Sequence, residues 1–174
     1  MNRDFRKASI ALAVGTVATA TSLAGAAPAS AGATFELLTF NGLSGKCLAI
    51  AEGSTANGAR AIQWTCNGKA EQRWHWSNGR LVNEKSGKCL AIGNDSEAAG
   101  APAIQWTCGP GLEQRWYEWS QGPKEGWSFE NANSGLWLAI AKASGNNGAA
   151  AIQWHAPRDL IWKYEQLWAQ HVVS

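Results

Sequence analysis

The segment Gly45-Lys46-Cys47-Leu48-Ala49-Ile50 decides the fold, because the sequence contains it three times. It returns unchanged at residues 87–92 and, with two substitutions, at residues 135–140. Each copy is followed by Ala-Ile-Gln-Trp and then by Glu-Gln-x-Trp. Three tandem copies of a unit of about 40 residues indicate one supersecondary motif used three times. Any ligand site built from a unit's own residues should then occur up to three times.

The first 31 residues predict a secretory signal peptide. Arg3, Arg6 and Lys7 precede a run without charges, residues 8–27, and the leader ends in Ala29-x-Ala31. This order of basic, apolar and small residues is typical of a signal that is cleaved after Ala31. A membrane anchor is the alternative, but Gly and Thr interrupt the run and no strongly hydrophobic stretch reaches spanning length. We therefore expect a secreted, extracellular protein with no membrane insertion.

Residues 32–174 have the length of one ordinary domain, with the repeats at about 34–78, 79–122 and 127–170. The whole sequence has 15 Lys and Arg against 13 Asp and Glu, but three of the basic residues and one acid lie in the leader. The secreted part is formally neutral. Because nucleic acid is bound chiefly through clustered Lys and Arg, it is not an expected partner.

Four cysteines fall in the first two repeats, each pair separated by 19 positions. Equal spacing within the repeats of a secreted chain predicts two disulfides, Cys47–Cys66 and Cys89–Cys108. A metal site is the alternative, but Cys-x-x-Cys and a His at ligand spacing are both missing, so we expect no metal. In the third repeat Trp137 and Ala156 stand at the cysteine positions, and we expect this large and small pair to fill the space of the bridge.

Short segments in which apolar and polar residues alternate predict an all-β fold with four strands in each repeat. The first strands are expected at residues 34–41, 81–83 and 128–131, each followed by the turn Asn-x-x-Ser-Gly. Cys-Leu-Ala-Ile, Ala-Ile-Gln-Trp and the Gln-x-Trp segment supply the other three. Twelve strands in three equal blocks favour a closed barrel without edge strands. Extra residues at 121–126 and 157–162 predict two surface loops.

The motifs Gly-Lys-Cys-Leu, Gln-Trp-x-Cys-Asn-Gly and Gln-x-Trp resemble the ricin-type lectin family across residues 32–174. The resemblance implies a β-trefoil: a six-stranded barrel closed at one end by three hairpins, with pseudo-threefold symmetry. It also implies a non-catalytic, sugar-binding protein without a cofactor. In the family Gln-x-Trp is mainly structural, and we expect these residues to be buried, the Trp in the barrel core and the Gln bonded to the backbone. They are Gln72, Trp74, Gln114, Trp116, Gln166 and Trp168.

The chain departs from the family at the residue after Cys-Leu, where sugar-binding members usually have an Asp that accepts hydrogen bonds from the sugar. Here that residue is Ala49, Ala91 or Ala139. Our hypothesis is that a Trp platform and a Glu acceptor in each repeat replace it. The pairs are Trp64 with Glu71, Trp106 with Glu113, and Trp154 with Glu165. The alternative is structural: strand alternation places Ile62, Trp64 and Cys66 on one apolar face that could be the core, and the glutamates could pair with Lys69, Arg73 or Arg115.

Two functions from different classes follow. The first is a carbohydrate-binding protein that recognises a polysaccharide or glycan through up to three weak sites. The second is a trefoil that has lost sugar binding and serves as a hydrolase inhibitor or a protein-interaction module, which the three alanines favour. For that function the 157–162 insertion would be the contact loop, with Trp162 as its anchor. Catalytic motifs that would indicate an enzyme are missing from the sequence.

Overall fold

The computed structural model describes residues 34–39, 44–121, 126–157 and 164–173. These residues form twelve antiparallel strands in one sheet and six 3-10 turns of three residues each. The predicted all-β class is confirmed. The predicted signal peptide, most of both predicted insertions and Trp162 lie outside the described residues. Within the described part of the chain, no helix has the length and apolar character needed to cross a bilayer.

The strands divide into three sets of four, which match the three sequence repeats. The first set is β1 (Phe35–Thr39), β2 (Cys47–Ile50), β3 (Ala61–Trp64) and β4 (Arg73–Ser77). The second set is β5 (Arg80–Asn83), β6 (Cys89–Ile92), β7 (Ala103–Trp106) and β8 (Trp116–Ser120). The third set is β9 (Trp127–Asn131), β10 (Trp137–Ile140), β11 (Ala151–Trp154) and β12 (Trp168–Val172).

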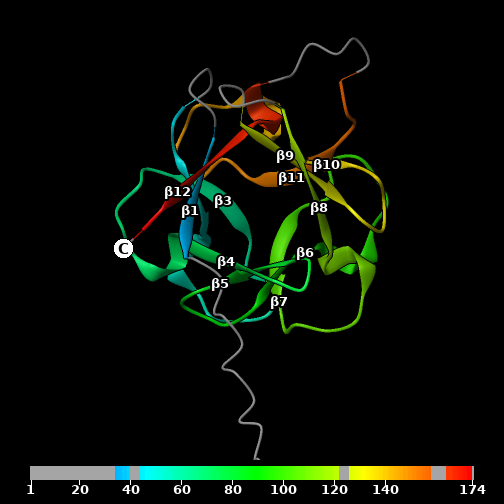
Figure 1. The fold of residues 1–174 in the computed structure, drawn as a ribbon, viewed down its shortest axis with the longest axis horizontal. Coiled ribbons are helices and arrows are strands. Elements are labelled where there is room, and N and C mark those ends of the chain that lie inside the picture. Colours follow the sequence, from blue (N-terminus) through cyan, green and yellow to red (C-terminus); the bar gives the residue numbers. More distant parts are fainter. Residues whose placement is uncertain (1–33, 40–43, 122–125, 158–163, 174) are drawn as a thin grey trace, which may run out of the picture. The chain divides into compact units, whose positions relative to one another are not determined.

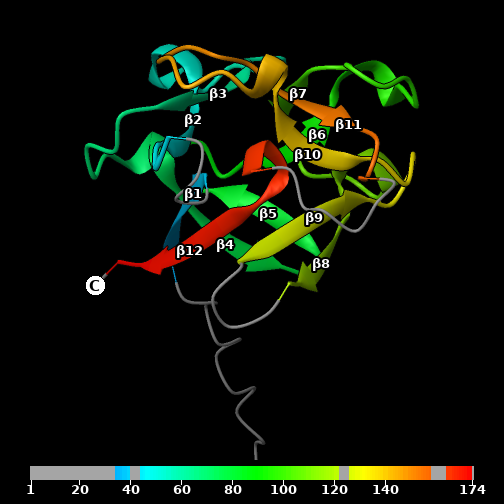
Figure 2. The same ribbon diagram turned by 90° about the horizontal axis from the view of Figure 1, so that it is seen from above.

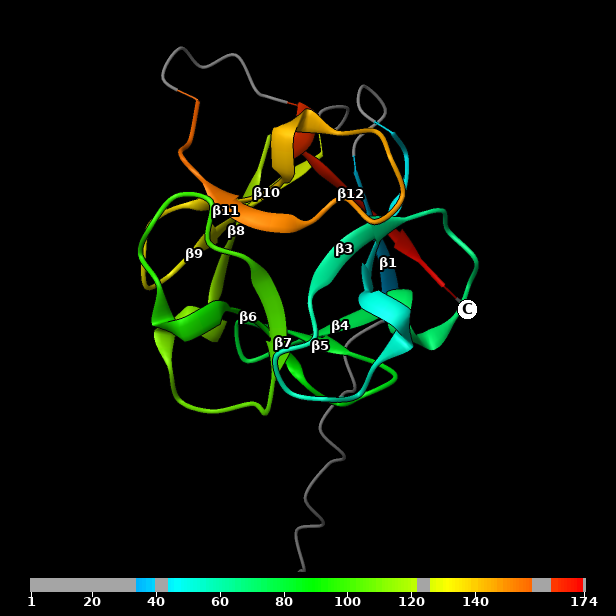
Figure 3. The same ribbon diagram turned by 180° about the vertical axis from the view of Figure 1, so that it is seen from behind.

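The twelve strands form two layers, a barrel and a cap. β1, β4, β5, β8, β9 and β12 make the barrel, in which β1 pairs with β4 and β12, and β9 pairs with β8 and β12. The hairpins β2–β3, β6–β7 and β10–β11 lie together on one side of it (Figure 2). Seen from the cap, the three hairpins surround a common centre (Figure 3). This is the β-trefoil arrangement that the family resemblance implies, and Figure 1 shows it from the opposite side.

The three tryptophans of Gln-x-Trp form the centre of the barrel, as predicted. Trp74 and Trp168 are wholly buried and Trp116 almost so, together with Leu37, Leu81 and Phe129. Each buried indole N–H donates to a backbone carbonyl of the strand after the repeat's turn, at 3.0–3.2 Å. The acceptors are Leu48, Leu90 and Leu138. A large apolar ring can therefore be buried here without leaving its polar edge unpaired.

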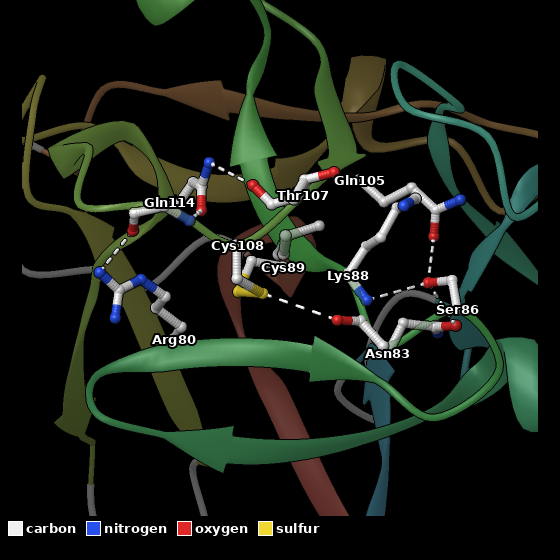
Figure 4. Close-up of a disulfide and its surroundings, with 12 residues drawn as sticks. Arg80, Asn83, Ser86, Lys88, Cys89, Gln105, Thr107, Cys108 and Gln114 are labelled. Carbon is white, nitrogen blue, oxygen red and sulfur yellow. Dashed lines mark hydrogen bonds between the residues drawn. A yellow bond between two sulfur atoms is a disulfide. The ribbon is translucent and has the colours of Figure 1, made fainter.

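The glutamines of Gln-x-Trp are also buried. The sequence predicts them in the fourth strands, but they lie in 3-10 turns instead. The turns are η2 (Ala70–Gln72), η4 (Leu112–Gln114) and η6 (Tyr164–Gln166). Gln72 accepts from the N–H of Asn67 at 2.8 Å and donates to the carbonyl of Thr65 at 3.0 Å. Figure 4 shows Gln114 bonded in the same way to Thr107. The amide thus ties the turn to the end of the third strand.

Gln166 departs from this pattern because its Oε1 has no partner among the described residues. Its Nε2 donates to the carbonyl of His155 at 2.7 Å, as in the other repeats. However, Pro157 occupies the position at which Asn67 and Gly109 supply a backbone N–H. Proline lacks that hydrogen, so the third repeat loses one hydrogen bond where its extra residues begin.

Both predicted disulfides are present, Cys47–Cys66 and Cys89–Cys108. Each connects the start of a second strand to the segment after the third strand (Figure 4). The pair expected to fill the missing third bridge is placed differently. Ala156 is exposed, and Trp137 is partly exposed, whereas Cys47 and Cys89 are wholly buried. Trp137 instead lines a surface pocket, which is described below.

Candidate functional site

The platform tryptophans Trp64, Trp106 and Trp154 lie at the ends of β3, β7 and β11 and are exposed by 43%, 46% and 46%. The alternative that they belong to a core face is therefore wrong. β3, β7 and β11 contact one another around the centre of the cap (Figure 3). At the first inward position of each strand, Ala61, Ala103 and Ala151 are wholly buried. The apolar face of Ile62 and Trp64 consequently points outward.

The second inward residue of each of these strands is a glutamine that fastens one repeat to another. Gln63 accepts from Ser44 Oγ at 2.9 Å and donates to the carbonyls of Ser144 and Asn146 in the third repeat. Gln105 and Gln153 make the same three bonds, each to a serine of its own repeat and to the loop of the preceding repeat. A wholly buried amide with all these partners costs little to bury.

The same loops position the platform tryptophans. The ring of Trp64 lies 3.9 Å from the point that a Cβ on Gly148 would occupy, and Gly148 has a φ of +82°. Gly58 and Gly100 face Trp106 and Trp154 at 3.8 and 3.6 Å, also with positive φ. One edge of each indole therefore rests on the backbone of a neighbouring repeat, and glycine is favoured there by its positive φ.

Two of the three contacts between repeats carry an additional bridge. Asn57 Oδ1 accepts from the backbone N–H and the hydroxyl of Thr107, and Asn147 Oδ1 accepts in the same way from Thr65, all at 2.9–3.1 Å. Each asparagine precedes a glycine, which is typical of a turn and does not by itself indicate a bridge to another repeat. At the third contact the corresponding residues are Ala99 and His155, which cannot form the same bridge.

In the first repeat, Trp64 and Glu71 line one open pocket of about 580 Å³. Its floor is apolar and includes Ala49 and Ile50, and its rim includes Lys69 and Lys85. Ala49 is buried, so the position where family members carry an Asp offers a methyl group to the pocket. Two carboxylates line the pocket, those of Glu52 from η1 (Ala51–Gly53) and of Glu71 from η2.

Two contacts from the second repeat hold Glu71 in place. Asn83 Nδ2 donates to the backbone carbonyl of Glu71 at 3.0 Å. Lys85 Nζ lies 3.8 Å from Glu71 Oε2, and the Glu71 side chain is only 15% exposed. Lys85 was not among the partners that the sequence suggested. The sequence feature that points to Lys85 is the turn Asn-x-x-Ser-Gly in which it lies, because the asparagine of that turn binds the backbone of the Glu of the preceding repeat.

The third repeat forms a comparable pocket of about 480 Å³. Trp154 and Glu165 line it together with Ala139, Ile152 and Lys142. The arrangement of platform, acid and alanine floor is therefore the same as in the first repeat. Its lining is otherwise less polar, because Lys142 is the only residue with a charge besides Glu165 among those that line it.

The second repeat differs in the position of its acid. Trp106 is exposed like its two equivalents, but the carboxylate of Glu113 lies directly against Gly111, where any Cβ would overlap it. Asn94 and Asp95 both have positive φ in the 3-10 turn η3 (Gly93–Asp95), and Asn133 Nδ2 donates to the Asp95 carbonyl at 3.1 Å. The structure thus brings Trp and Glu to one pocket in repeats one and three.

The comparisons with known proteins agree with this geometry. A family model described as ricin-type beta-trefoil lectin domain-like matches residues 28–80 and 75–154. No curated protein sequence matches the chain significantly.

Similar solved structures share the fold. ThreeFoil, a designed threefold symmetric protein, is 29% identical with a TM-score of 0.73, and the match covers 80% of this chain and 99% of ThreeFoil. An exo-β-1,3-galactanase from Clostridium thermocellum is 28% identical with a TM-score of 0.73, covering 84% of this chain but 31% of the enzyme. A Macrolepiota procera ricin B-like lectin in complex with lactose has a TM-score of 0.65 at 15% identity, covering 84% of this chain and 100% of that lectin. At that identity the last likeness concerns the fold alone.

Proposed function

We propose that this chain, which belongs to the ricin-type β-trefoil lectin domain-like family, is a secreted, non-catalytic protein that binds a polysaccharide or glycan. The binding sites are the repeat pockets, with Trp64, Trp106 and Trp154 as platforms and Glu71, Glu113 and Glu165 as acceptors. The observation that carries the proposal is that an exposed indole and a carboxylate line one pocket in repeats one and three.

The pockets have the composition that recognition of a sugar ring requires. One face of a pyranose is apolar and packs against an indole, while its hydroxyl groups need acceptors and donors with fixed positions. Glu71 and Lys85 supply both in the first repeat. A hydrogen bond to a charged acceptor contributes about 1.5–3 kcal/mol, so an acid displaced from the floor to η2 can replace much of the binding lost at Ala49.

Several weak sites on one molecule favour a polymeric ligand. When two or three sites engage one chain, the second contact becomes intramolecular, and the avidity can exceed the single-site affinity by about 10²–10⁴-fold. The galactanase and the lactose-binding lectin make β-1,3-galactan and lactose reasonable first probes. Xylan is a third probe, because the family includes xylan-binding members.

The test is affinity electrophoresis in gels that contain β-1,3-galactan or xylan, with the triple variant Trp64→Ala, Trp106→Ala and Trp154→Ala. We expect the retardation of the wild type to be lost, with an apparent Kd raised by about a hundredfold. Glu71→Gln with Glu165→Gln should weaken binding less, because the shape of the pockets is kept. Tyr117→Ala is the matched control, since Tyr117 is exposed and lies outside the lining of the repeat pockets.

A folded triple variant that is retarded like the wild type would contradict the role of the three tryptophans as platforms. The three buried alanines Ala49, Ala91 and Ala139 favour the second candidate, an inhibitor or interaction module without sugar binding. That function would be supported if the wild type were retained by neither polysaccharide and did not bind soluble lactose. The loop expected to mediate it, residues 157–162, lies for the most part outside the described residues.

A further inference from the structure

We infer that the chain has a further saccharide subsite, built by Trp119, Glu130 and Trp137 on the outer side of β8, β9 and β10 and unrelated to the repeat pockets. It rests on the proposed function only in sharing its class of ligand, a single pyranose ring of a glycan. The pocket has a volume of about 370 Å³ and is lined by Trp119, Ser120, Gln121, Glu130 and Trp137. None of these residues lines either repeat pocket described above.

The strand register places Glu130 beside Trp137. Glu130 on β9 pairs with Tyr117 on β8 and with Trp137 on β10. Paired residues of neighbouring antiparallel strands point to the same face. Trp119, two residues beyond Tyr117, is 51% exposed and donates its indole N–H to Glu130 Oε2 at 2.9 Å. One carboxylate oxygen is thereby fixed, and the indole is oriented beside it.

The other two repeats carry none of these residues at the equivalent positions. The row Tyr117, Glu130 and Trp137 corresponds to His75, Val82 and Cys89 in the register of β4, β5 and β6. It corresponds to Ala169, Leu38 and Cys47 in the register of β12, β1 and β2. Counting from the buried Trp of Gln-x-Trp, Trp119 corresponds to Ser77 and His171. Three large departures from the repeat pattern therefore meet in one pocket, which a merely structural substitution for one disulfide would not require.

The chemistry of the lining favours a neutral sugar ring. Two indoles offer apolar surface, the carboxylate of Glu130 offers acceptor capacity, and Ser120 and Gln121 add a hydroxyl and an amide. Volumes of about 300–1,000 Å³ are usual for small-ligand sites, and this pocket is near the lower end.

Glu118 takes no part in this pocket. Gln170 donates to the Glu118 carboxylate, and partial burial raises the pKa of Glu118 while that hydrogen bond opposes the rise.

The experiment is affinity electrophoresis in β-1,3-galactan and in xylan with Trp119→Ala and Glu130→Gln, each made in the wild type and in the triple variant of the platform tryptophans. Tyr117→Ala is the matched control, because Tyr117 is 56% exposed on the same strand but does not line this pocket. We expect Trp119→Ala and Glu130→Gln to raise the apparent Kd by about fivefold or more, and Tyr117→Ala to leave it unchanged. The melting temperature of Glu130→Gln, which keeps the shape of the side chain, should stay that of the wild type.

The outcomes separate the two proposals. Trp119→Ala and Glu130→Gln variants that bind like the wild type overturn the subsite and leave the repeat pockets standing. Loss of binding in these variants, with an unaffected platform triple variant, supports the subsite and contradicts the repeat pockets. Equal losses in Tyr117→Ala and Trp119→Ala, or tighter binding of choline than of either saccharide, would overturn the subsite, because an organic cation also fits aromatic faces beside a carboxylate.

Discussion

At the scale of single residues, the glutamine of Ala-Ile-Gln-Trp explains why an apolar face is exposed. Burying the Trp of this strand in place of the Gln would normally be more favourable, since a Trp side chain buries far more apolar area. Here Gln105 is wholly buried and bonded to Ser86 Oγ at 2.7 Å, as Figure 4 shows, and it also donates to two carbonyls at 2.9 and 3.0 Å. An indole has a single N–H donor and no acceptor, so it could bond to only one of these two carbonyls.

Gln105→Ala should therefore lower the free energy of unfolding by about 1–3 kcal/mol, because the carbonyls of Ser54 and Ala56 would lose the hydrogen bonds that the wholly buried Gln105 amide donates. Urea unfolding followed by far-ultraviolet circular dichroism measures this directly. Gln121→Ala is the control: Gln121 also donates to a backbone carbonyl, that of Trp119 at 3.3 Å, but it is partly exposed, so water can replace it. Equal stabilities of the two variants would contradict the role assigned to Gln105.

Residue patterns predicted which Trp and Glu line the pockets of repeats one and three, but they did not decide which side of β3 faces the core. The pairing of platform Trp with Glu could be written down from the repeats, as could the burial of Gln72 and Trp74. Alternation alone could not decide which side of β3 faces the core, because the apolar side contains Ile62 and Trp64. That choice depends on the small space at the centre of the cap and on hydrogen bonds to another repeat, and neither is visible in one strand's sequence.

At the scale of elements, each third strand is held by a covalent or polar connection to its own repeat and by hydrogen bonds to another. In repeats one and two a disulfide encloses the second and third strands, with 19 positions between its cysteines. The third repeat has neither the bridge nor the backbone donor for Gln166 Oε1. Its β10–β11 hairpin still keeps the full register from Trp137↔Trp154 to Ile140↔Ala151.

Cys89→Ala with Cys108→Ala should cost about 3 kcal/mol of stability, the value expected for a closed loop of this length. The corresponding change at Cys47 and Cys66 should cost about the same, because the two bridges have the same separation. Guanidinium unfolding of both double variants beside the wild type tests this. A loss below about 1 kcal/mol in either variant would mean that the hydrogen bonds of the hairpin alone hold the strands.

At the scale of the whole molecule, the three repeats are joined in a ring. The loop of the first repeat binds Gln105, that of the second binds Gln153, and that of the third binds Gln63. Each platform indole lies at such a contact between repeats, beside a loop glycine of its neighbour. The repeat pockets are therefore products of the assembled trefoil and not of one repeat by itself, and this is why Gly148 lines the pocket of Trp64.

The architecture at this scale could be predicted from the sequence, because three copies of one motif indicate a threefold arrangement and the motifs resemble a family with the β-trefoil fold. The departures from symmetry could not. Lys85 reaches Glu71 only through the turn of the next repeat, and Trp119 meets Glu130 only through the pairing of β8 with β9. Both contacts depend on which strands are neighbours in space. The few positions at which the repeats differ in sequence do not show which strands these are.

The most direct test of the central claim is an ¹⁵N-correlated NMR titration of the indole N–H groups with oligosaccharides of β-1,3-galactan and of xylan. We predict that the signals of Trp64 and Trp154 shift and saturate with one of these ligands. Those of Trp74, Trp116 and Trp168, which donate to buried carbonyls, should remain in place. Signals of the three exposed platform tryptophans that stay fixed throughout both titrations would contradict the proposal that the repeat pockets bind saccharide.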